Sequence, residues 1–372
     1  MLLTRNRTGP IAIDLGSYAL RAIQLAGRDG ATRVLAAACR VDPSAEHGEA
    51  PGRSTVVQAL RDTLAQGRFV GKRVVSVLTE REVSVKNIRM PEMPEAELAL
   101  AVRFEAIERI PGLDDDAEIR FLPAGLVPGA AESQQEVIVL AAPAATVRRH
   151  LEPFSELGLE SVGIDAAPCA VFRPFERYLR RAQDQEQVNV FADIGWSGTR
   201  ITITRGNRIA FTKAFDVGGA RLDRLVAEDR SVDPAKAREL RRQVAAERCE
   251  SREPSSAPVD PATVEAVDAA VRAVAEQLGK EIGLCLRYYA VTFRGQRPDT
   301  ITCVGGEALD THFLVELSGV TGLPCRAGFP LRGLNCAGAF REGEDRRPMA
   351  DWATVTGLSM KSVRCVTESV RR

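Results

Sequence analysis

The chain has 372 residues, of which 45% are hydrophobic and 27% are charged, a composition that indicates a folded globular protein and excludes a disordered one. Fifty basic residues balance fifty acidic ones, so the net charge argues against nucleic acid as a general partner. At this length we expect two lobes, or one large domain with an insert.

The N-terminal part predicts three strands, a helix and a further strand. The segments IAIDLG, ALRAIQLAG and ATRVLAAAC are short, apolar and separated by turn-forming residues. A helix follows, with Ser54 as its capping residue and Gln66 near its end, because apolar residues recur there at a 3.6-residue period. Gly67 ends this helix, and a strand is predicted at Arg73 to Leu78.

An inserted α+β subdomain is predicted next. Its expected elements are a strand VSVKNI, a helix Glu95 to Ile110 stopped by Pro111-Gly112, strands at Glu118 to Pro123 and Glu136 to Ala142, and a helix at Ala144 to Leu157. A helix from about Cys169 to Arg181 then leads into the polar run AQDQEQ, which we interpret as the boundary between the lobes.

The second half begins with an internal repeat. VNVFADIG, TRITITRG and RIAFTKAF reproduce the three-strand pattern of the N-terminus, with the same Asp-x-Gly at the end of the first strand. The later expected elements are a charged helical region Leu222 to Arg248, a loop SREPSSAPVDPA, an amphipathic helix Thr263 to Val291, a strand TITCVGG, a helix Leu309 to Ser318 and a short tail segment from Trp352.

These patterns predict the domain boundaries. We expect a first lobe of residues 10–80 and 165–184, the inserted subdomain at 81–164, a second lobe at 185–360 and a tail at 361–372. The N-terminus has too short an apolar stretch for a signal peptide, and no later segment approaches the roughly 18 to 20 apolar residues that span a bilayer, so we expect no direct membrane insertion. Eight scattered cysteines without a C-x-x-C pair are typical of reduced thiols in a cytoplasmic protein.

Both predicted lobes carry an Asp-x-Gly turn followed by a hydroxyl residue, Asp14–Gly16 with Ser17 and Asp193–Gly195 with Ser197. Glycine lets the backbone approach a polyphosphate, amides and hydroxyls donate to phosphate oxygens, and a carboxylate can hold Mg²⁺ directly or through water. One such turn alone is better explained as a plain strand connection, but the pair favours a phosphate site. Residues Cys303–Glu307 supply a third loop, which indicates either a ligand at a helix N-terminus or an ordinary tight turn.

These motifs resemble the actin-like ATPases, with IAIDLGSYALRAIQL and VFADIGWSGTRITI as the two phosphate motifs and TCVGGEA as the adenosine motif. Within that superfamily the chain resembles the PilM family of type IV pilus assembly proteins, which are related to FtsA. The similar segments are VSVKNIRMPEMPEAELALAVRFEAIERIPGLDDDAEIRF, VEAVDAAVRAVAEQLGKEIGLCLRYYA and ATVTGLSM. The resemblance spans about Ile11 to Met360 and implies an α/β, actin-like fold of two ribonuclease-H-like lobes, with a small α+β subdomain inserted in the first.

The resemblance also implies an ATP site between the lobes, with at most weak hydrolysis and no assignable catalytic residue. Asp14 and Asp193 would hold Mg²⁺ through water. The expected nucleotide-binding residues are Asp14, Gly16, Ser17, Tyr18, Arg21, Asp193, Gly195, Trp196, Ser197, Gly198, Thr199, Gly305, Gly306 and Glu307. The chain departs from the family pattern at Tyr18, Ala19, Arg21 and Trp196, where small residues and a lysine are usual.

A partner is implied as well. Members of this family sit on the cytoplasmic face of the inner membrane and hold the short cytoplasmic tail of a single-span PilN-like protein. The expected groove lies between the inserted subdomain and the first lobe and includes Phe104, Ile107 and Ile110, although core packing explains such apolar residues equally well. Other components of the pilus platform and self-association into filaments are left open by fold analogy.

Two further functions remain open from the sequence. A scaffold that keeps the fold but binds no nucleotide is favoured by Tyr18, Ala19 and Trp196. A small-molecule kinase shares the actin-like duplication, but no catalytic base can be assigned to it, and no nucleophile or carboxylate motif accompanies the three histidines in the sequence.

Overall fold

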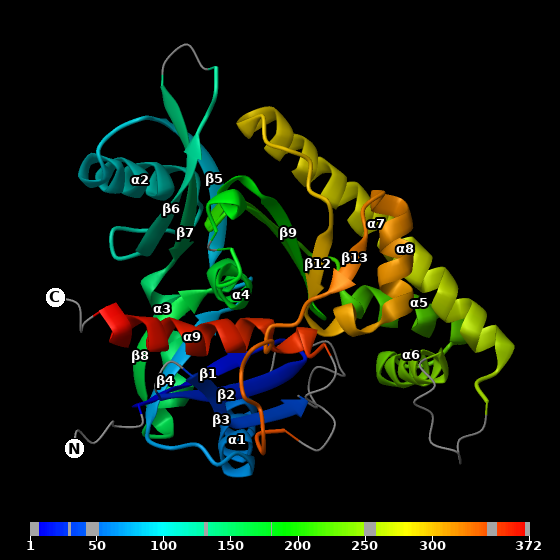
Figure 1. The fold of residues 1–372 in the computed structure, drawn as a ribbon. Coiled ribbons are helices and arrows are strands. Elements are labelled where there is room, and N and C mark those ends of the chain that lie inside the picture. Colours follow the sequence, from blue (N-terminus) through cyan, green and yellow to red (C-terminus); the bar gives the residue numbers. More distant parts are fainter. Residues whose placement is uncertain are drawn as a thin grey trace.

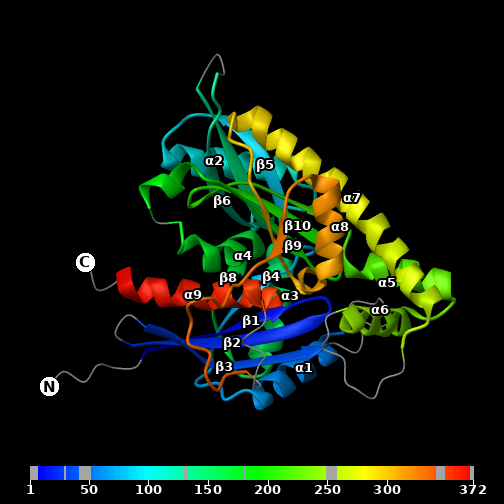
Figure 2. The ribbon, with the colours of Figure 1, turned by 45° about the vertical axis from the view of Figure 1, so that its right-hand side comes forward.

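The computed structural model of the protein describes residues 7–28, 31–41, 52–129, 133–179, 181–248, 258–340 and 348–368. Two five-stranded sheets form the cores of two lobes, and a three-stranded sheet forms a subdomain beside them (Figures 1 and 2). Within these ranges, none of the helices combines the length and apolar character needed to cross a bilayer. Residues 251–257 of the predicted polar loop and 369–372 of the predicted tail lie outside the described residues.

The first lobe is built on a sheet with the strand order β3-β2-β1-β4-β8. Successive hairpins join the first three strands in antiparallel fashion, and the last two strands add in parallel. The strands are β1 (Arg7–Leu15), β2 (Ala19–Arg28), β3 (Ala31–Val41), β4 (Arg73–Leu78) and β8 (Glu160–Ala166). The helices beside the sheet are α1 (Arg53–Gln66), α3 (Ala144–Glu156), α4 (Ala167–Glu176) and α9 (Ala353–Glu368).

Alternation along β1 decides which helices cover which face of this sheet. Ile11 and Ile13 pack with Leu60 of α1 and Phe154 of α3, whereas Ala12 between them faces the cluster that contains Val355 of α9. Because successive side chains of a strand point to opposite faces, the sheet is buried on both sides.

The second lobe repeats this topology with the strand order β11-β10-β9-β12-β13. Three consecutive antiparallel strands are again followed by two parallel ones, so the internal repeat predicted from the sequence is confirmed. The strands are β9 (Val188–Ile194), β10 (Thr199–Arg205), β11 (Arg208–Phe215), β12 (Ile301–Val304) and β13 (Cys325–Ala327). The helices are α5 (Gly219–Arg230), α6 (Pro234–Arg248), α7 (Pro261–Phe293) and α8 (Thr311–Thr321), with short 3₁₀ turns at Ala182–Glu186, Gly306–Leu309 and Ala350–Trp352.

The inserted subdomain has a sheet of order β5-β7-β6 and one helix. Its elements are β5 (Ser84–Pro91), α2 (Glu95–Arg109), β6 (Glu118–Leu126) and β7 (Gln134–Ala142). Val137 and Val139 of β7 pack under α2, whereas Ile138 faces the cluster that contains Phe211 of the second lobe. The subdomain is therefore inserted in the sequence of the first lobe but packs against the second lobe.

Several boundaries differ from those predicted. The N-cap of α1 is Gly52, which offers no side-chain cap, and not Ser54. Strand β8 was not predicted, and it pairs with β4, so residues 144–164, which were predicted in the insert, belong to the first lobe. The sequence did not indicate β8 because this edge strand has no fully buried residue, and its sequence therefore lacks the hydrophobic alternation that marks a strand.

Two helical regions also differ from expectation. The region predicted as Leu222 to Arg248 is two helices, α5 and α6, separated at Ser231, whose left-handed φ of 52° ends the first. Helix α4 ends at Glu176 and not at Arg181. At the C-terminus, α9 begins within the range predicted for the second lobe yet lies across the first sheet (Figure 1), because its buried Val355 and Leu358 complete that lobe's core.

Candidate functional site

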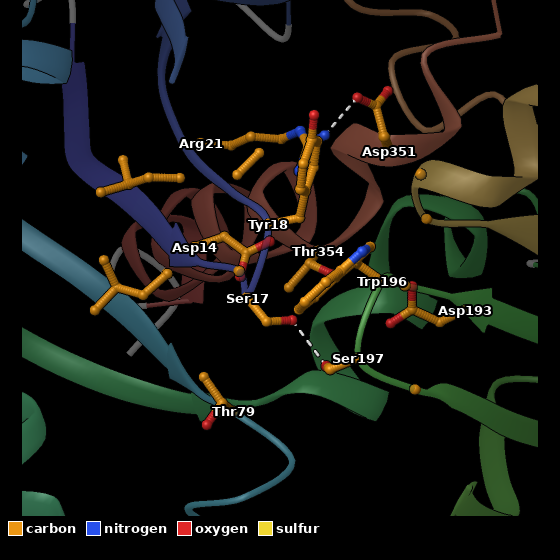
Figure 3. A pocket seen from close by; sticks show the side chains of 18 of the residues that line it. Asp14, Ser17, Tyr18, Arg21, Thr79, Asp193, Trp196, Ser197, Asp351 and Thr354 are labelled. Atoms are coloured by element: carbon orange, nitrogen blue, oxygen red, sulfur yellow. Dashed lines mark hydrogen bonds and ion pairs between the residues drawn. The ribbon is translucent and has the colours of Figure 1, made fainter. Parts of the chain in front are cut away.

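A cavity of about 760 Å³ lies between the lobes, within the usual size range of small-molecule sites. Figure 3 shows residues of both Asp-bearing hairpins around it. Its lining includes all of the predicted nucleotide-binding residues except Thr199. Thr199 is fully buried, and its hydroxyl donates to the carbonyl oxygen of Val217 at 2.6 Å. The structure thus brings Asp14 and Asp193, from the two halves of the chain, to one shared cleft.

Glycines make the tight turns of this site possible. A Cβ at Gly16 would lie 2.7 Å from the carbonyl oxygen of Ala19, so only glycine fits the tip of the first hairpin. Gly305 has a φ of +87°, and a Cβ there would lie 2.5 Å from the carbonyl oxygen of Ile194. The loop after β12 is thereby held directly against the end of β9.

Each hairpin places an arginine directly across from its aspartate. Asp14 pairs with Arg21 in the β1–β2 register, and Asp193 pairs with Arg200 in the β9–β10 register. Arg21 Nη2 lies 2.7 Å from an oxygen of Asp351, at the start of the segment that leads into α9. These pairs put positive charge at the base of both hairpins.

Arg200 is only 3% exposed and contacts carboxylates of both lobes. Its guanidinium lies 3.8 Å from Asp193 of its own lobe and 3.4 Å from Glu80, which follows β4 in the first lobe. Neither Arg200 nor Glu80 was predicted as a site residue.

Burial disfavours the ionised forms of the carboxyl groups in the site. Burial raises the pKa of Asp14 to about 6, although Arg21 and Arg200 act to lower it. Burial also raises the pKa of Asp193 and that of Glu80. An added cation near these three carboxyl groups would stabilise their ionised forms.

The residues fit Mg²⁺ only as an outer-shell ion. No group of three or more His, Cys, Asp or Glu side chains within the described ranges is arranged to hold a metal directly. Mg²⁺ commonly keeps several waters and binds through one or two carboxylates together with substrate phosphates. Asp14 and Asp193 match that second arrangement.

The tips of the hairpins touch each other across the cleft. Ser17 Oγ donates to Ser197 Oγ at 2.8 Å, as the dashed line in Figure 3 marks. A phosphate group could not lie between these two hydroxyls without separating them.

The two aromatic residues that depart from the family pattern line the cavity together. The rings of Tyr18 and Trp196 have centroids 6.5 Å apart. Trp196 does not pack away from the cleft but lines the cavity, and its indole N–H donates to the buried Asp223 at 2.9 Å. The guanidinium of Arg238 lies over both rings, 4.4 Å from the centre of Tyr18 and 5.1 Å from that of Trp196.

Helix α6 supplies three arginines to the lining of the cavity, Arg238, Arg241 and Arg242, which were not predicted as site residues. Arg238 and Arg241 both donate to the buried carboxylate of Asp223, at 2.8 and 2.6 Å. Arg241 also pairs with Glu307, the residue predicted at the nucleoside end. Burial lowers the pKa of Arg241, but Glu307 and Asp223 raise it above its usual range, so this arginine stays charged.

His150 makes two side-chain hydrogen bonds that no sequence motif predicted. His150 of α3 contacts Ser76 Oγ through Nε2 at 2.9 Å and Glu82 through Nδ1 at 3.1 Å. Ser76 is fully buried in β4, so it is not accessible as a nucleophile. The arrangement instead ties α3 to the segment that follows β4 and carries Glu80.

The predicted partner residues are distributed over different environments. Phe104 is 69% exposed, and Leu100, four residues earlier on α2, is 73% exposed. Ile107 is half-buried, whereas Ile110 is only 3% exposed within the subdomain core. Ile110 is therefore not available to a partner in this conformation.

The chain is similar to one known protein family and to several solved structures. The model of a family described as type IV pilus assembly protein PilM matches residues 12–252. Among solved structures, the fold is similar to that of a PilM–PilN type IV pilus biogenesis complex, with a TM-score of 0.78 and 22% identity over 97% of this chain and 99% of that chain. No curated protein matched the chain.

Two further solved structures share the fold. Ethanolamine utilization protein EutJ from Carboxydothermus hydrogenoformans has a TM-score of 0.55 and 14% identity, over 96% of this chain and 90% of that chain. MreB 5 of Spiroplasma citri bound to AMPPNP has a TM-score of 0.53 and 11% identity, over 98% of this chain and 99% of that chain. These likenesses confirm the predicted actin-like fold.

Proposed function

The chain belongs to the family of the type IV pilus assembly protein PilM, and from this membership we propose that it is an ATP-binding assembly protein of a type IV pilus or a related secretion machine. It acts in the cytoplasm, peripheral to the inner membrane, by holding the cytoplasmic tail of a PilN-like single-span protein. ATP binding shifts the closure of the lobes and thereby the affinity for that tail.

The main observation in support of ATP binding is that Asp14 and Asp193 line the same cavity of about 760 Å³. Backbone amides of the two glycine turns, the hydroxyls of Ser17 and Ser197 and the Arg21 guanidinium would hold the phosphates. The nucleoside would lie toward Gly305–Glu307. A protein of similar fold is known with AMPPNP bound, which supports the proposal.

Mg²⁺ would be held by the nucleotide phosphates, with Asp14 and Asp193 positioning its waters, and when bound it would supply neutralising charge to the phosphates. This role agrees with the raised pKa values of both carboxyl groups, since a nearby cation favours their ionised forms.

The contacts across the cleft support a change in lobe closure when nucleotide binds. Inserting a phosphate between Ser17 and Ser197 must break their 2.8 Å hydrogen bond and move one hairpin relative to the other. A ligand that binds one lobe arrangement better than the other shifts the equilibrium, and its coupling to a second ligand is reciprocal.

The proposed docking site for the partner tail is the outer face of α2. Leu100 and Phe104 lie one turn apart on this helix and are both largely exposed. Exposed apolar side chains at this spacing suit a short amphipathic peptide. A solved structure of similar fold is a PilM–PilN complex, which supports a PilN-like protein as the partner.

A scaffold without nucleotide is the second candidate, and one observation favours it. Tyr18, Trp196 and Arg238 already fill part of the cavity with mutual contacts. On this alternative the cleft is a permanent inter-lobe contact, and the protein serves only as an interaction module.

Calorimetric titration with Mg-ATP separates the two candidates. We expect wild-type protein to bind, Asp14→Ala and Asp193→Ala to bind much more weakly, and Asp115→Ala, at an exposed turn of the subdomain, to bind like wild type. No binding by folded wild-type protein would favour the scaffold. Titration of a PilN-like tail peptide with and without ATP then tests the switch, which equal affinities would eliminate.

A further inference from the structure

Tyr18 belongs to the first lobe but makes its contacts in the second. It lies at the tip of the β1–β2 hairpin, where its hydroxyl accepts a hydrogen bond from Arg242 Nη2 at 2.6 Å. Its ring lies under the guanidinium of Arg238 and beside Trp196. Together these contacts form a latch between the lobes, defined here as Tyr18 with Arg238, Arg242 and Trp196.

The second-lobe half of the latch is held in place without Tyr18. Asp223 is only 1% exposed and accepts hydrogen bonds from both Arg238 Nε and the Trp196 indole. The guanidinium and the indole therefore form a preorganised surface of one flat cation and one aromatic ring. Such a surface offers a stacking position to a planar π system.

The latch leaves buried donors unsatisfied. Arg238 and Arg241 side chains are each 9% exposed, and both line the cavity. Arg238 Nη2 and Arg241 Nε have no hydrogen-bond partner among the described residues. A buried N–H without an acceptor is unfavourable, and the phenol ring of Tyr18 cannot relieve it.

A nucleotide offers a planar base that can stack in place of the Tyr18 ring, and oxygen acceptors on its ribose and phosphates for the unpaired N–H groups. Resting on the proposed function, we propose that Tyr18 is a built-in competitor of the nucleotide. Its phenol holds the stacking position against Arg238 and Trp196 that the base takes, so the base binds only by displacing it.

This competition links base binding to lobe separation. Displacing Tyr18 breaks its hydrogen bond with Arg242 and its ring contacts, all of which join the two lobes. An inorganic polyphosphate has no base, so it has no means of replacing the phenol. The latch therefore distinguishes nucleotides from polyphosphate, although both carry the same phosphate chain.

The test compares wild type, Tyr18→Ala and Tyr18→Phe in titrations with Mg-ATP and with inorganic tripolyphosphate. We expect Tyr18→Ala to lower the Kd for ATP about tenfold, because the competitor is removed from the bound position. Tyr18→Phe keeps the ring but loses the hydrogen bond from Arg242, so its Kd should fall about threefold. The Kd for tripolyphosphate should fall by much less than the Kd for ATP in both variants, because tripolyphosphate gains only easier separation of the hairpins and has no base to stack.

Each outcome separates this inference from the proposed function. Binding of ATP by wild type, with tighter binding by Tyr18→Ala, would support both. Binding by Tyr18→Ala alone would support the competition but favour the scaffold for the wild-type protein. If wild type binds ATP and Tyr18→Ala binds it equally or more weakly, Tyr18 is a bystander or a stacking partner, and the inference is overturned while ATP binding stands. If neither folded protein binds ATP, both are overturned. An equal gain for tripolyphosphate would mean that the substitution merely opens the cleft, which also overturns the competition.

Discussion

The guanidinium of Arg200 lies 3.4 Å from the carboxylate of Glu80, and this ion pair joins the second lobe to the first. Arg200 also faces Asp193, directly opposite in the β9–β10 register. Because Arg200 is 3% exposed, its charge is stabilised by these two carboxylates and not by water.

Replacing Arg200 should therefore destabilise the protein. We expect Arg200→Met to lower the free energy of unfolding by about 3 kcal/mol, because Glu80 and Asp193 lose the cation that faces them in a buried place. Urea unfolding at neutral pH measures this. The matched control is Arg205→Met on the same strand, whose pair with Glu186 is exposed and should be worth less than about 1 kcal/mol. Equal losses in both variants would contradict the role of Arg200.

Stability should depend on pH through Asp14. Its pKa in the folded protein is raised to about 6, so the folded state favours the protonated form. The corresponding stabilisation is present in full below the pKa of the unfolded chain and is lost as the pH rises through about 6.

The substitution Asp14→Asn should remove this dependence. Asparagine resembles the neutral acid, so the variant should be more stable than wild type by about 2 kcal/mol at pH 8 without nucleotide, with little difference near pH 4. Denaturant unfolding of both proteins across this range tests it. A wild-type protein at least as stable as the variant at pH 8 would show that Asp14 is not held in an unfavourable ionised form.

The two glycines after β12 should respond differently to alanine. Gly305 has a positive φ and no room for a Cβ, whereas a Cβ at Gly306 would meet nothing within 4 Å. We expect Gly305→Ala to cost about 2 kcal/mol of stability and to weaken ATP binding, and Gly306→Ala to change stability by less than about 0.5 kcal/mol. Thermal unfolding and ATP titration of the pair provide the measurement. Similar behaviour of both variants would mean that the loop is not held against β9 as described.

Substitutions on the outer face of α2 should affect partner binding, whereas a substitution on its inner face should affect stability. Leu100→Ala and Phe104→Ala should each weaken binding of a PilN-like tail peptide about tenfold, since both side chains are largely exposed, and should leave stability nearly unchanged. Leu98→Ala, on the buried face at 2% exposure, should instead cost about 3 kcal/mol of stability. Unchanged peptide affinity in both outer-face variants would exclude this face as the docking site.

The hairpins could be predicted from the sequence because their signals are local. Short apolar segments and glycine turns mark β1, β2, β9 and β10, and the repeat of Asp-x-Gly relates the two halves. Arg200 could have been found by the same signal, since Arg21 follows Asp14 at the same separation as Arg200 follows Asp193. The repeat extends from the aspartates to their arginines.

Other site residues carry no local signal. Arg238 and Arg241 look like ordinary charges of a surface helix until the fold brings Asp223 and Glu307 to them. The burial of Ile110 depends on how α2 packs on β7, and the placement of β8 depends on its pairing with β4. Contacts between distant segments decide these features, and a linear pattern does not contain them.

The packing of the inserted subdomain has a mechanical consequence. Its two connections emerge from the first lobe, yet Asn87 donates to the backbone of β11 at 2.9 Å and Tyr288 of α7 donates to Glu136 at 3.2 Å. The subdomain is therefore linked to both lobes, covalently to one and by packing to the other. Rotation of one lobe against the other must either slide its sheet over β11 or carry it along and strain both connections. A force applied to α2 by a bound partner would therefore act on both lobes at once and so on the cleft between them.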